Sequence, residues 1–558
     1  MFPLEVEKFF ELFIGNQLFA YAFLSILSAT LLFLSSMKFI LVLQQCNYRG
    51  KRFFAWLSHK DTPYMSRLML LCMLAFLFFC VLNMTFVSLV GEVFASYVGF
   101  FSYILFAIMY INSEKHINAK IPLKKTKRLV RLCITYIILL LGTTYGFIYL
   151  LNYLAFVIDN EVFAILRFSA ICLLPLLIPI ILFLAYLINE PLEFLIRRYY
   201  IRRATQILNK SSVIKIGITG SFGKTSVKEI LRTILSQKYR VLATPRSFNT
   251  PLGIARTVNH LDSTHDIFIA EMGARQKGDI KELAGFVKPS FAVLTGVNHQ
   301  HLETFGSIEN TMNTKYELFE CLPEDGFAFF ACNNQNALEL YQRFNGEKYL
   351  AGLDNEDALV FAKDVKMDGK GTTFTLVIDG QKGVKCSTIL LGSHSVKNIC
   401  LASAVAYKIG MTPKEIALGI SKIQSIGNRL ELVPNNKKII IIDDSYNSNE
   451  EGIKSAMEVL DNFNGRKIVL TPGLVELGKV ESLVNFEFGK TLASHADKVI
   501  VVGKHNAEMI IKGLIEAGMD KENIKFAKNL NKGNEILNEM VEEGDVVLFE
   551  NDLPDNYN

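Results

Sequence analysis

A glycine-rich segment separates a β-branched run from a helical pattern near residue 220. It reads Gly217-Ile-Thr-Gly-Ser-Phe-Gly-Lys-Thr-Ser226. Glycines in such a turn let backbone amides point at phosphate oxygens, and the helix that follows adds positive potential. Lys224 would reach the β- and γ-phosphates, and the hydroxyl of Thr225 would bind Mg²⁺. Ile218 stands where the strict phosphate-loop pattern has its first glycine, so a glycine-rich turn with an exposed lysine is the competing interpretation.

Further polar side chains follow the next two predicted strands. Glu271 ends one apolar run, and His299 and His301 follow another. Carboxylates and imidazoles at the carboxyl ends of parallel strands, beside a phosphate loop, are where metal ligands would lie. Taken singly, a solvated turn glutamate and surface histidines are the alternatives.

Two later clusters flank a run at residues 438–442. One is Asn428-Arg-Leu-Glu431, and the other is Asp443-Asp-Ser-Tyr-Asn-Ser-Asn449. An arginine such as Arg429 can bind a phosphate through two parallel hydrogen bonds. Without further support, a β-turn explains either cluster equally well.

The segments that must position these residues alternate in character from residue 212 onward. Short β-branched runs are separated by charged segments of helix length, which predicts parallel sheets built from right-handed β-α-β units. The predicted strands are Val213–Ile218, Ile267–Ala270, Phe291–Leu294, Lys438–Ile442, Lys467–Leu470, Lys498–Val502 and Asp545–Phe549.

The first 210 residues are different, because they contain runs long enough to cross a bilayer as helices. The five runs are Leu18–Leu43, Leu68–Val90, Val93–Ile111, Leu132–Ile158 and Phe163–Ile188. Lysines and arginines concentrate after the first, third and fifth runs, which predicts an N-terminus outside and cytoplasmic residues after 189. Pro175 and Pro179 are expected to kink the fifth helix. A simple anchor and a module that binds a lipid substrate or a partner are both consistent with this pattern.

The charge of the whole chain conceals this division. The 558 residues carry a formal charge of +5, but residues 1–210 hold 20 Lys and Arg against 10 Asp and Glu, and the rest hold 39 against 44. The first third is basic and apolar, and the remainder is mildly acidic. This division argues against a nucleic-acid partner and favours a membrane module joined to a soluble module. The nine cysteines include no C-x-x-C pair, so neither a zinc site nor a disulfide frame is expected.

In their order along residues 212–550, these clusters resemble the Mur ligase family of ATP-dependent amide-bond synthetases. The branch most similar in its motifs is the UDP-N-acetylmuramoyl-tripeptide–D-alanyl-D-alanine ligases (MurF). The matching stretches are residues 217–226, Thr244-Pro-Arg-Ser-Phe-Asn249-Thr-Pro-Leu-Gly253, Glu271-Met-Gly-Ala, His301-Leu-Glu-x-Phe-Gly-Ser307, Lys315-Tyr-Glu317, Gly392-Ser-His-Ser-Val-Lys-Asn398, Asn428-Arg-Leu, Asp443–Asn449 and Glu476-Leu-Gly. The family's own loop variant is Thr-Gly-x-x-Gly-Lys-Thr, which accommodates Ile218.

The resemblance implies a role for each matched residue. ATP phosphates would be held by the loop residues Gly220, Ser221, Gly223, Lys224, Thr225 and Ser226. The remaining nucleotide contacts would come from Asn249 near the phosphates or the acceptor, Asn398 at adenine, Arg429 at the γ-phosphate and Asp444 at ribose. The implied Mg²⁺ ligands are Thr225, Glu271, His301 and Lys315, the last as a carbamate, since a free ammonium would repel a metal. Lys224, Lys315, His301 and Glu271 would form the catalytic set.

The expected architecture is an all-α transmembrane bundle of five helices followed by α/β domains. These are the transmembrane module (1–205), a phosphate-loop ATPase domain with a parallel sheet (206–426) and a Rossmann-like C-terminal domain (427–558). The five-helix module stands where the family has a UDP-sugar-binding domain. Phe549-Glu550-Asn551-Asp552 stands where the family has a basic Lys-Gly-Ser-like element, so an acidic amine pocket that favours a cationic or free-amino substrate is expected.

The expected activity is that of an ATP- and Mg²⁺-dependent ligase in the bacterial cytoplasmic membrane, with its ligase domains in the cytoplasm. It would join an amino acid or short peptide amine to a carboxylate on a cell-envelope precursor of the peptidoglycan type, lipid-linked precursors included, through an acyl phosphate. One alternative is a polymerising ligase similar to poly-γ-glutamate synthetases. An alternative of another class is an ATP-driven transporter subunit or scaffold with a decayed ligase site.

Overall fold

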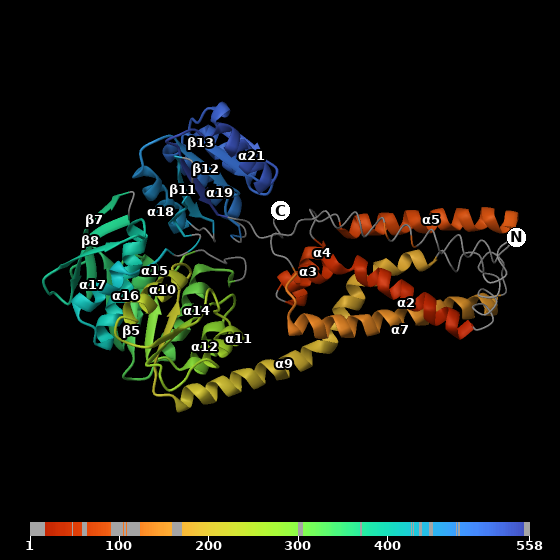
Figure 1. Cartoon of the computed structure of the whole chain (residues 1–558), viewed down its shortest axis with the longest axis horizontal. Coiled ribbons are helices and arrows are strands. Elements are labelled where there is room, and N and C mark those ends of the chain that lie inside the picture. Colours follow the sequence, from red (N-terminus) through yellow and green to blue (C-terminus); the bar gives the residue numbers. More distant parts are fainter. Residues whose placement is uncertain are drawn as a thin grey trace. The chain divides into compact units, whose positions relative to one another are not determined.

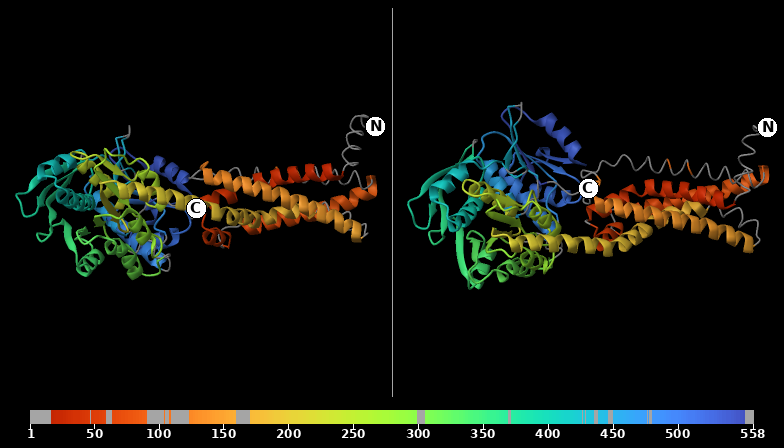
Figure 2. Two further views of the ribbon diagram at one scale, coloured as in Figure 1. Left: turned by 90° about the horizontal axis from the view of Figure 1, so that it is seen from below. Right: turned by 60° about the horizontal axis from the view of Figure 1, so that its bottom comes forward.

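The computed structural model divides the chain into two compact units, Met1–Ile196 and Arg197–Asn558 (Figures 1 and 2). It describes residues 17–46, 48–58, 64–90, 104, 108, 123–158, 170–298, 305–368, 371–425, 427, 429–434, 438–445, 450–475, 477 and 480–551. The three predicted domains (1–205, 206–426 and 427–558) remain predictions.

The described residues of the first unit are mainly helical. Its helices are α2 (Gln17–Ser35), α3 (Met37–Gln45), α4 (Gly50–Ser58), α5 (Tyr64–Val90), α7 (Lys127–Ile158), the 3₁₀ helix η1 (Ala170–Leu177) and α9 (Ile178–Lys210), which continues into the second unit. α2 packs along α7, and α5 packs against η1 (Figure 2). Most of the buried side chains are apolar, among them Leu32, Phe39, Leu140 and Leu182, and a few such as Thr144 are polar. Many apolar side chains also face outward, as expected of helices surrounded by lipid.

Two helices in the described residues are long and apolar enough to cross a membrane, Lys127–Leu154 and Cys172–Lys210. A third span is possible if Ala22–Ser35 and Met37–Gln45, which meet at 45°, are counted as one. These three correspond to the first, fourth and fifth predicted runs. The second run lies within α5, where Leu70–Leu82 is an apolar helical stretch of described residues. The third run, Val93–Ile111, lies outside the described residues apart from positions 104 and 108.

The expected kink in the fifth run takes the form of a change of helix type. Pro175 lies inside η1, and the α-helix begins at Ile178. A proline lacks the N–H that an α-helix needs at that position, so the tighter 3₁₀ turn precedes the regular helix.

The charged end of α7 is paired with α9 within the first unit. Arg131 lies 2.6 Å from Glu193, and Arg128 lies 3.1 Å from Glu190. The guanidinium of Arg128 also stacks on the ring of Tyr48 at 4.2 Å. Part of the basic charge that the sequence concentrates here is therefore neutralised inside the unit.

A nine-stranded sheet forms the first half of the second unit, in the order β2-β3-β1-β4-β5-β6-β7-β8-β9. Its strands are β1 (Ile214–Thr219), β2 (Val241–Ala243), β3 (Ile267–Glu271), β4 (Phe291–Leu294), β5 (Phe327–Ala331), β6 (Glu347–Leu353), β7 (Val360–Asp368), β8 (Gly371–Ile378) and β9 (Val384–Thr388). The strands from β2 to β7 pair in parallel, whereas β7, β8 and β9 pair antiparallel.

Helices cover both faces of this sheet (Figure 1). One face packs on α10 (Lys224–Leu235), α16 (Ser393–Ile409) and α17 (Pro413–Ser421). The other packs on α11 (Pro251–Val258), α12 (Asp279–Val287), α14 (Ile308–Glu320) and α15 (Gln335–Arg343). Ala204 and Leu208, near the end of α9, are buried in this second core.

The C-terminal sheet has six strands in the order β10-β11-β15-β12-β13-β14. They are β10 (Glu431–Leu432), β11 (Ile440–Asp444), β12 (Lys467–Thr471), β13 (Lys498–Val502), β14 (Ile524–Ala527) and β15 (Val546–Glu550). All neighbours are parallel except β10 and β11. The associated helices are α18 (Glu450–Asp461), α19 (Glu481–His495), α20 (Ala507–Glu516), η3 (Lys521–Asn523) and α21 (Leu530–Met540).

The seven predicted strands are all present, each shifted by at most two residues at an end. The expectation of purely parallel sheets is corrected, since both sheets are mixed. The antiparallel strands β7–β9 lie at one edge, where hairpin connections need no crossover helix and leave no βαβ pattern in the sequence.

Candidate functional site

The glycine-rich segment forms a tight loop between β1 and α10. Gly220 and Gly223 have φ values of 154° and 74°, which favour glycine. A Cβ at Gly220 would lie 2.0 Å from Oγ1 of Thr295, so no larger residue fits there without movement. The backbone of the loop therefore lies next to the N-terminus of α10, an arrangement that is typical of phosphate-binding loops.

Lys224 is the first residue of α10, and its side chain folds back over the loop. Its Nζ donates to the carbonyl oxygens of Gly220 (2.7 Å) and Ser221 (3.1 Å). Burial lowers the pKa of Lys224 to about 8, against the opposing effect of Glu271 and with a further lowering by Arg429. The lysine is held by carbonyl oxygens at the position that a phosphate-binding lysine needs.

Glu271 is the buried carboxylate at the end of β3, and three side chains contact it. Thr225 Oγ1 donates to Glu271 Oε2 over 3.0 Å, and Asn249 Nδ2 donates to Oε1 over 3.2 Å. The third contact is the ammonium of Lys228, 3.3 Å from Oε2. The structure thus brings together Thr225, Glu271 and Asn249, which come from three separate motifs.

The segment after β4 is tied to the loop by residues that the sequence does not single out. Thr295 Oγ1 donates to the carbonyl oxygen of Phe222, and Ser221 Oγ accepts from the amide of Asn298 over 3.2 Å. Asn334 caps α15 and also accepts from the amide of Val297 over 3.1 Å. These contacts fix the start of the segment that leads to His299 and His301. No motif signals them, since each is a hydrogen bond between distant segments.

Lys315 lies on α14 with only 3% of its surface exposed. Burial lowers its pKa well below the usual range, and the positive charge of Lys224 lowers it further. Its ammonium group lies 6.0 Å from the ring centre of Phe305. Burial therefore disfavours the charged ammonium form here more than at an exposed lysine.

Glu317, two residues further on, has a structural role. Its carboxylate accepts from the amides of Gly278 (2.8 Å) and Lys281 (2.9 Å), at the first turn of α12. Glu317 thus caps α12 from α14, which fixes the helix that carries Lys315.

The amide of Asn398 lies against the loop, since a Cβ at Gly223 would be 3.0 Å from its Oδ1. His394, one turn earlier in α16, accepts or donates at Nε2 with Ser395 Oγ over 3.1 Å, while its buried Nδ1 has no partner. Burial lowers the pKa of His394 to about 4, and Lys397 and Arg429 lower it further.

Arg429 and Asp444 come from the C-terminal half of the unit. Asp444 Oδ1 accepts from the amide of Leu430 over 3.3 Å. Burial raises the pKa of Asp444 to about 7, although Arg429 opposes the change. Because Arg429 also affects Lys224 and His394, the predicted nucleotide residues share one electrostatic environment.

Several predicted residues cannot be placed. His299, His301, Asn428, Tyr446–Asn449 and Glu476 lie outside the described residues. Ser226 is the third residue of α10, in the turn that begins at Lys224.

The residues present fit the nucleotide and metal that the motifs imply. A glycine cradle that a Cβ would fill stands before a helix N-terminus. Beside it, Thr225 and Glu271 offer a hydroxyl and a carboxylate, the hard oxygen donors that Mg²⁺ prefers. In the part of the chain that is described, no three His, Cys, Asp or Glu side chains cluster as a metal site on their own. Phosphate oxygens and other donors would have to complete the shell.

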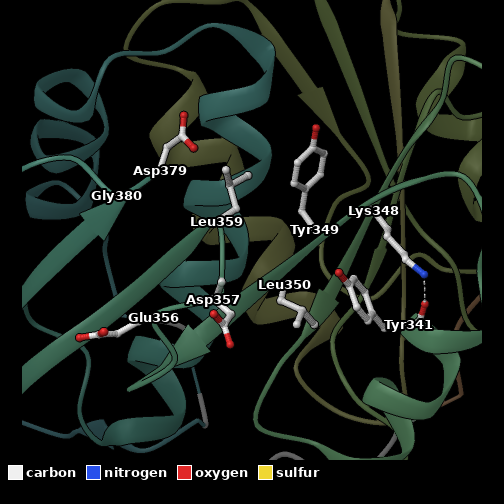
Figure 3. Close-up of a pocket in the computed structure, with 10 residues that line it drawn as sticks. Tyr341, Lys348, Tyr349, Leu350, Glu356, Asp357, Leu359, Asp379 and Gly380 are labelled. Carbon is white, nitrogen blue, oxygen red and sulfur yellow. Dashed lines mark hydrogen bonds between the residues drawn. The ribbon is translucent and has the colours of Figure 1, made fainter.

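A separate shallow pocket of about 280 Å³ lies over β6 and the ends of β7 and β8 (Figure 3). Tyr341 and Tyr349 line it, together with Glu356, Asp357 and Asp379. Each ring already faces a lysine of the chain, Lys348 at 4.7 Å from Tyr341 and Lys408 at 4.0 Å from Tyr349. The rings therefore serve internal packing.

Comparison with known proteins gives consistent matches over the second unit. Residues 218–406 match the Mur ligase middle domain, and residues 428–550 match the Mur ligase glutamate ligase domain. The UDP-N-acetylmuramoyl-tripeptide–D-alanyl-D-alanine ligase of Bacillus subtilis (strain 168) is 29% identical over 339 residues, which are 60% of this chain and 72% of that protein. The ligase of the same name from Escherichia coli (strain K12) is 29% identical over 296 residues, 52% of this chain and 65% of that one.

Solved structures agree. The crystal structure of MurF ligase from Thermotoga maritima in complex with ADP superposes with a TM-score of 0.58 at 26% identity, over 64% of this chain and 80% of that chain. The matched portion of this chain excludes most of the helical first unit.

Proposed function

The chain belongs to the Mur ligase family and is an ATP-dependent, ADP-forming amide ligase, and we propose that it joins an amine to a carboxylate of a cell-envelope precursor at the cytoplasmic membrane. The observation that carries the proposal is the junction of Lys224, Thr225 and Glu271. The side chains of Thr225 and Glu271 meet at the end of β3, and Lys224 folds over the glycine loop that follows β1. This arrangement supports binding of a nucleotide triphosphate with a divalent metal.

Lys224, Thr225 and the loop amides would hold the ATP phosphates, with Arg429 at the γ-phosphate, Asn398 at adenine and Asp444 at ribose. Thr225, Glu271, His301 and Lys315 would hold Mg²⁺. The metal, when bound, neutralises charge on the phosphoryl oxygens. The placement of Asn398 beside Gly223 supports a role for its amide in nucleotide binding.

The proposed reaction has two steps. The acceptor carboxylate oxygen attacks the γ-phosphorus, the bond to the β–γ bridging oxygen breaks, and ADP leaves. The amine nitrogen then attacks the acyl carbon, the bond from carbon to the phosphate oxygen breaks, and the nitrogen loses a proton. The products are the amide, ADP and phosphate. Lys224, pre-positioned by Gly220 and Ser221, supplies positive charge where the phosphoryl oxygens lie.

We propose that Lys315 acts as its carbamate. Only a neutral amine adds to CO₂, and burial lowers the pKa of Lys315 well below its usual range. The addition forms a nitrogen–carbon bond, releases one proton and turns a cation site into an anionic oxygen ligand. A free ammonium would instead repel a metal held by Glu271.

The amine substrate is proposed to be an amino acid or short peptide. The relatives' names specify D-alanyl-D-alanine, but Glu550 stands here in place of a basic family residue. Glu550 is fully buried at the end of β15, and its register partner in β11 is Asp444. An acidic residue in place of a basic one favours an amine that carries positive charge.

The membrane location is supported by the two to three long apolar helices of the first unit. We propose that the N-terminus lies outside and the ligase domains in the cytoplasm, where ATP is available. A membrane-bound acceptor, including a lipid-linked precursor, fits such an enzyme. The boundaries 1–205, 206–426 and 427–558 are proposed on the same basis.

The test uses the full chain purified in detergent or nanodiscs, with ATP, Mg²⁺, envelope precursors and candidate amines. Phosphate release should require both acceptor and amine, and mass spectrometry should find the amide. Turnover that is unchanged in Lys224→Ala and Lys315→Ala would show that the site assignment is wrong. Solute-dependent ATP turnover without amide formation would point to transport instead.

A further inference from the structure

Lys228 is a fully buried lysine one turn after Lys224 on α10, and neither the motifs nor the proposed reaction uses it. Its ammonium group has three acceptors. It lies 3.3 Å from Glu271 Oε2 and 3.4 Å from Glu229 Oε1, and it donates to the carbonyl oxygen of Arg246. A lysine has three N–H groups, so its hydrogen-bonding capacity is filled.

The contact with Glu271 has an electrostatic consequence. Oε2, the oxygen that Lys228 approaches, is also the oxygen that accepts from Thr225. The negative charge of Glu271 is therefore balanced inside the chain, on the side that faces the proposed metal position. Because Lys228 is shielded from solvent, water and salt screen this pair little.

We propose that Lys228 is the internal counter-ion of Glu271 and makes divalent-metal binding depend on nucleotide. Without nucleotide, the positive charges of Lys224 and Lys228 oppose the negative charge of Glu271 and weaken the attraction of the site for a metal. The phosphates of a bound nucleotide add the negative charge that overcomes this opposition. The metal then enters together with the nucleotide and does not occupy the empty site. This inference rests on the proposed function, since it takes Glu271 as a metal ligand.

A structural role is the competing explanation, since Lys228 also connects α10 to the segment that carries Asn249 through Arg246. The two explanations predict different metal binding for a variant whose side chain is neutral but can still donate a hydrogen bond. Lys228→Gln keeps a donor for Arg246 and loses the charge, whereas Lys228→Arg keeps the charge. If Lys228 acts as a counter-ion, arginine can take over its role, whereas glutamine cannot.

The chain offers a matched control in Arg232, one turn further along α10. Its Nε lies 2.9 Å from Oε2 of Glu229, so it shares a carboxylate partner with Lys228, but its side chain is 51% exposed. Solvent screens that pair, and Arg232→Met should leave metal binding unchanged.

The experiment measures Mn²⁺ binding to the full-length protein in detergent, from the electron paramagnetic resonance signal of free Mn²⁺, with and without a non-hydrolysable ATP analogue. We expect weak binding to the nucleotide-free wild type and binding at least about tenfold tighter in Lys228→Met and Lys228→Gln, because a buried opposing charge is removed. Lys228→Arg and Arg232→Met should resemble the wild type. Nucleotide-free Mn²⁺ binding that is no tighter in Lys228→Met and Lys228→Gln would overturn the proposal.

Two further measurements keep the outcomes distinct. If the Lys228 variants fail to fold, the wild type alone still tests the proposal. Mn²⁺ binding that is equally tight with and without nucleotide would contradict a counter-ion role for Lys228. The double variant Lys228→Met/Glu271→Gln tests the underlying assignment. If it keeps the tight Mn²⁺ site of Lys228→Met, Glu271 is not a metal ligand and the proposed function fails at that point, independently of Lys228.

Discussion

The hydroxyl of Thr225 donates a hydrogen bond to Oε2 of Glu271 over 3.0 Å, which joins the first turn of α10 to the end of β3. The two residues are 46 positions apart in the chain. Parallel pairing of β1 with β3, which sets Ile218 beside Glu271, brings them together. The pairing of these two proposed metal ligands is thus a consequence of strand order and not of local sequence.

Thr225→Val should lower ATP-dependent phosphate release at least about tenfold, because the variant keeps the shape and removes the hydroxyl. Glu271 would also lose one of its donors within the buried site. Thr225→Ser should restore most of the activity. The measurement is phosphate release against Mg²⁺ concentration, with Thr233→Val as control, since the hydroxyl of Thr233 donates to a backbone carbonyl on the same helix. If Thr225→Val were as active as the wild type, Thr225 would not be a metal ligand.

Lys315→Ala should abolish turnover, and ¹³C-bicarbonate should give a carbamate resonance in the wild type that this variant lacks. Burial lowers the pKa of Lys315, which favours the neutral amine that adds to CO₂, and acidification should reverse the modification. Removal of CO₂ from the buffer should lower activity and bicarbonate should restore it. A wild type that is fully active without CO₂ would contradict the carbamate. Lys238→Ala is a suitable control, since Lys238 pairs with Glu415 at the surface.

The predictable part of this fold is the part whose signals are local. Each predicted strand is a β-branched run, and the loop at 220–223 is marked by its glycines, so the residues alone are enough to place β1, β3 and β4. The antiparallel strands β7–β9 do not follow the pattern of strands separated by helix-length segments, although β8 is itself rich in β-branched residues.

The site is predictable where a residue belongs to a motif and not where its role depends on a distant partner. Thr225, Glu271 and Asn249 each belong to a motif, and the structure brings them together. Lys228, Thr295 and Asn334 act through contacts with segments 18 to 73 residues away, and single residues at such distances leave no spacing pattern. Glu317 also belongs to a motif, but only the structure shows that it caps α12.

The buried imidazole of His394 should make stability sensitive to acid. Its pKa is about 4 in the folded chain against an ordinary value of 6.5, so the unfolded chain binds more protons between these values. The stability that the neutral ring contributes is complete above pH about 6.5 and is lost as the pH falls towards 4, by at most about 1.4 kcal/mol per pH unit. His394→Gln should therefore show a smaller drop in melting temperature between pH 7 and pH 5 than the wild type. A parallel drop in both proteins would contradict this.

Glu317→Ala should destabilise the second unit by about 1–3 kcal/mol, because it leaves two amide groups at the first turn of α12 without their carboxylate acceptor. Glu317→Gln keeps one acceptor oxygen and loses the charge that favours a helix N-terminus, so its effect should be smaller. Denaturant unfolding of the full chain, followed by circular dichroism, measures both variants. Glu320→Ala is the matched control on α14, since Glu320 is 51% exposed and lies 3.9 Å from Arg343. Because α14 also carries Lys315, Glu317→Ala should lower phosphate release more than Glu320→Ala does. Equal stability of the Glu317→Ala and Glu320→Ala variants would mean that other contacts hold α12 in place.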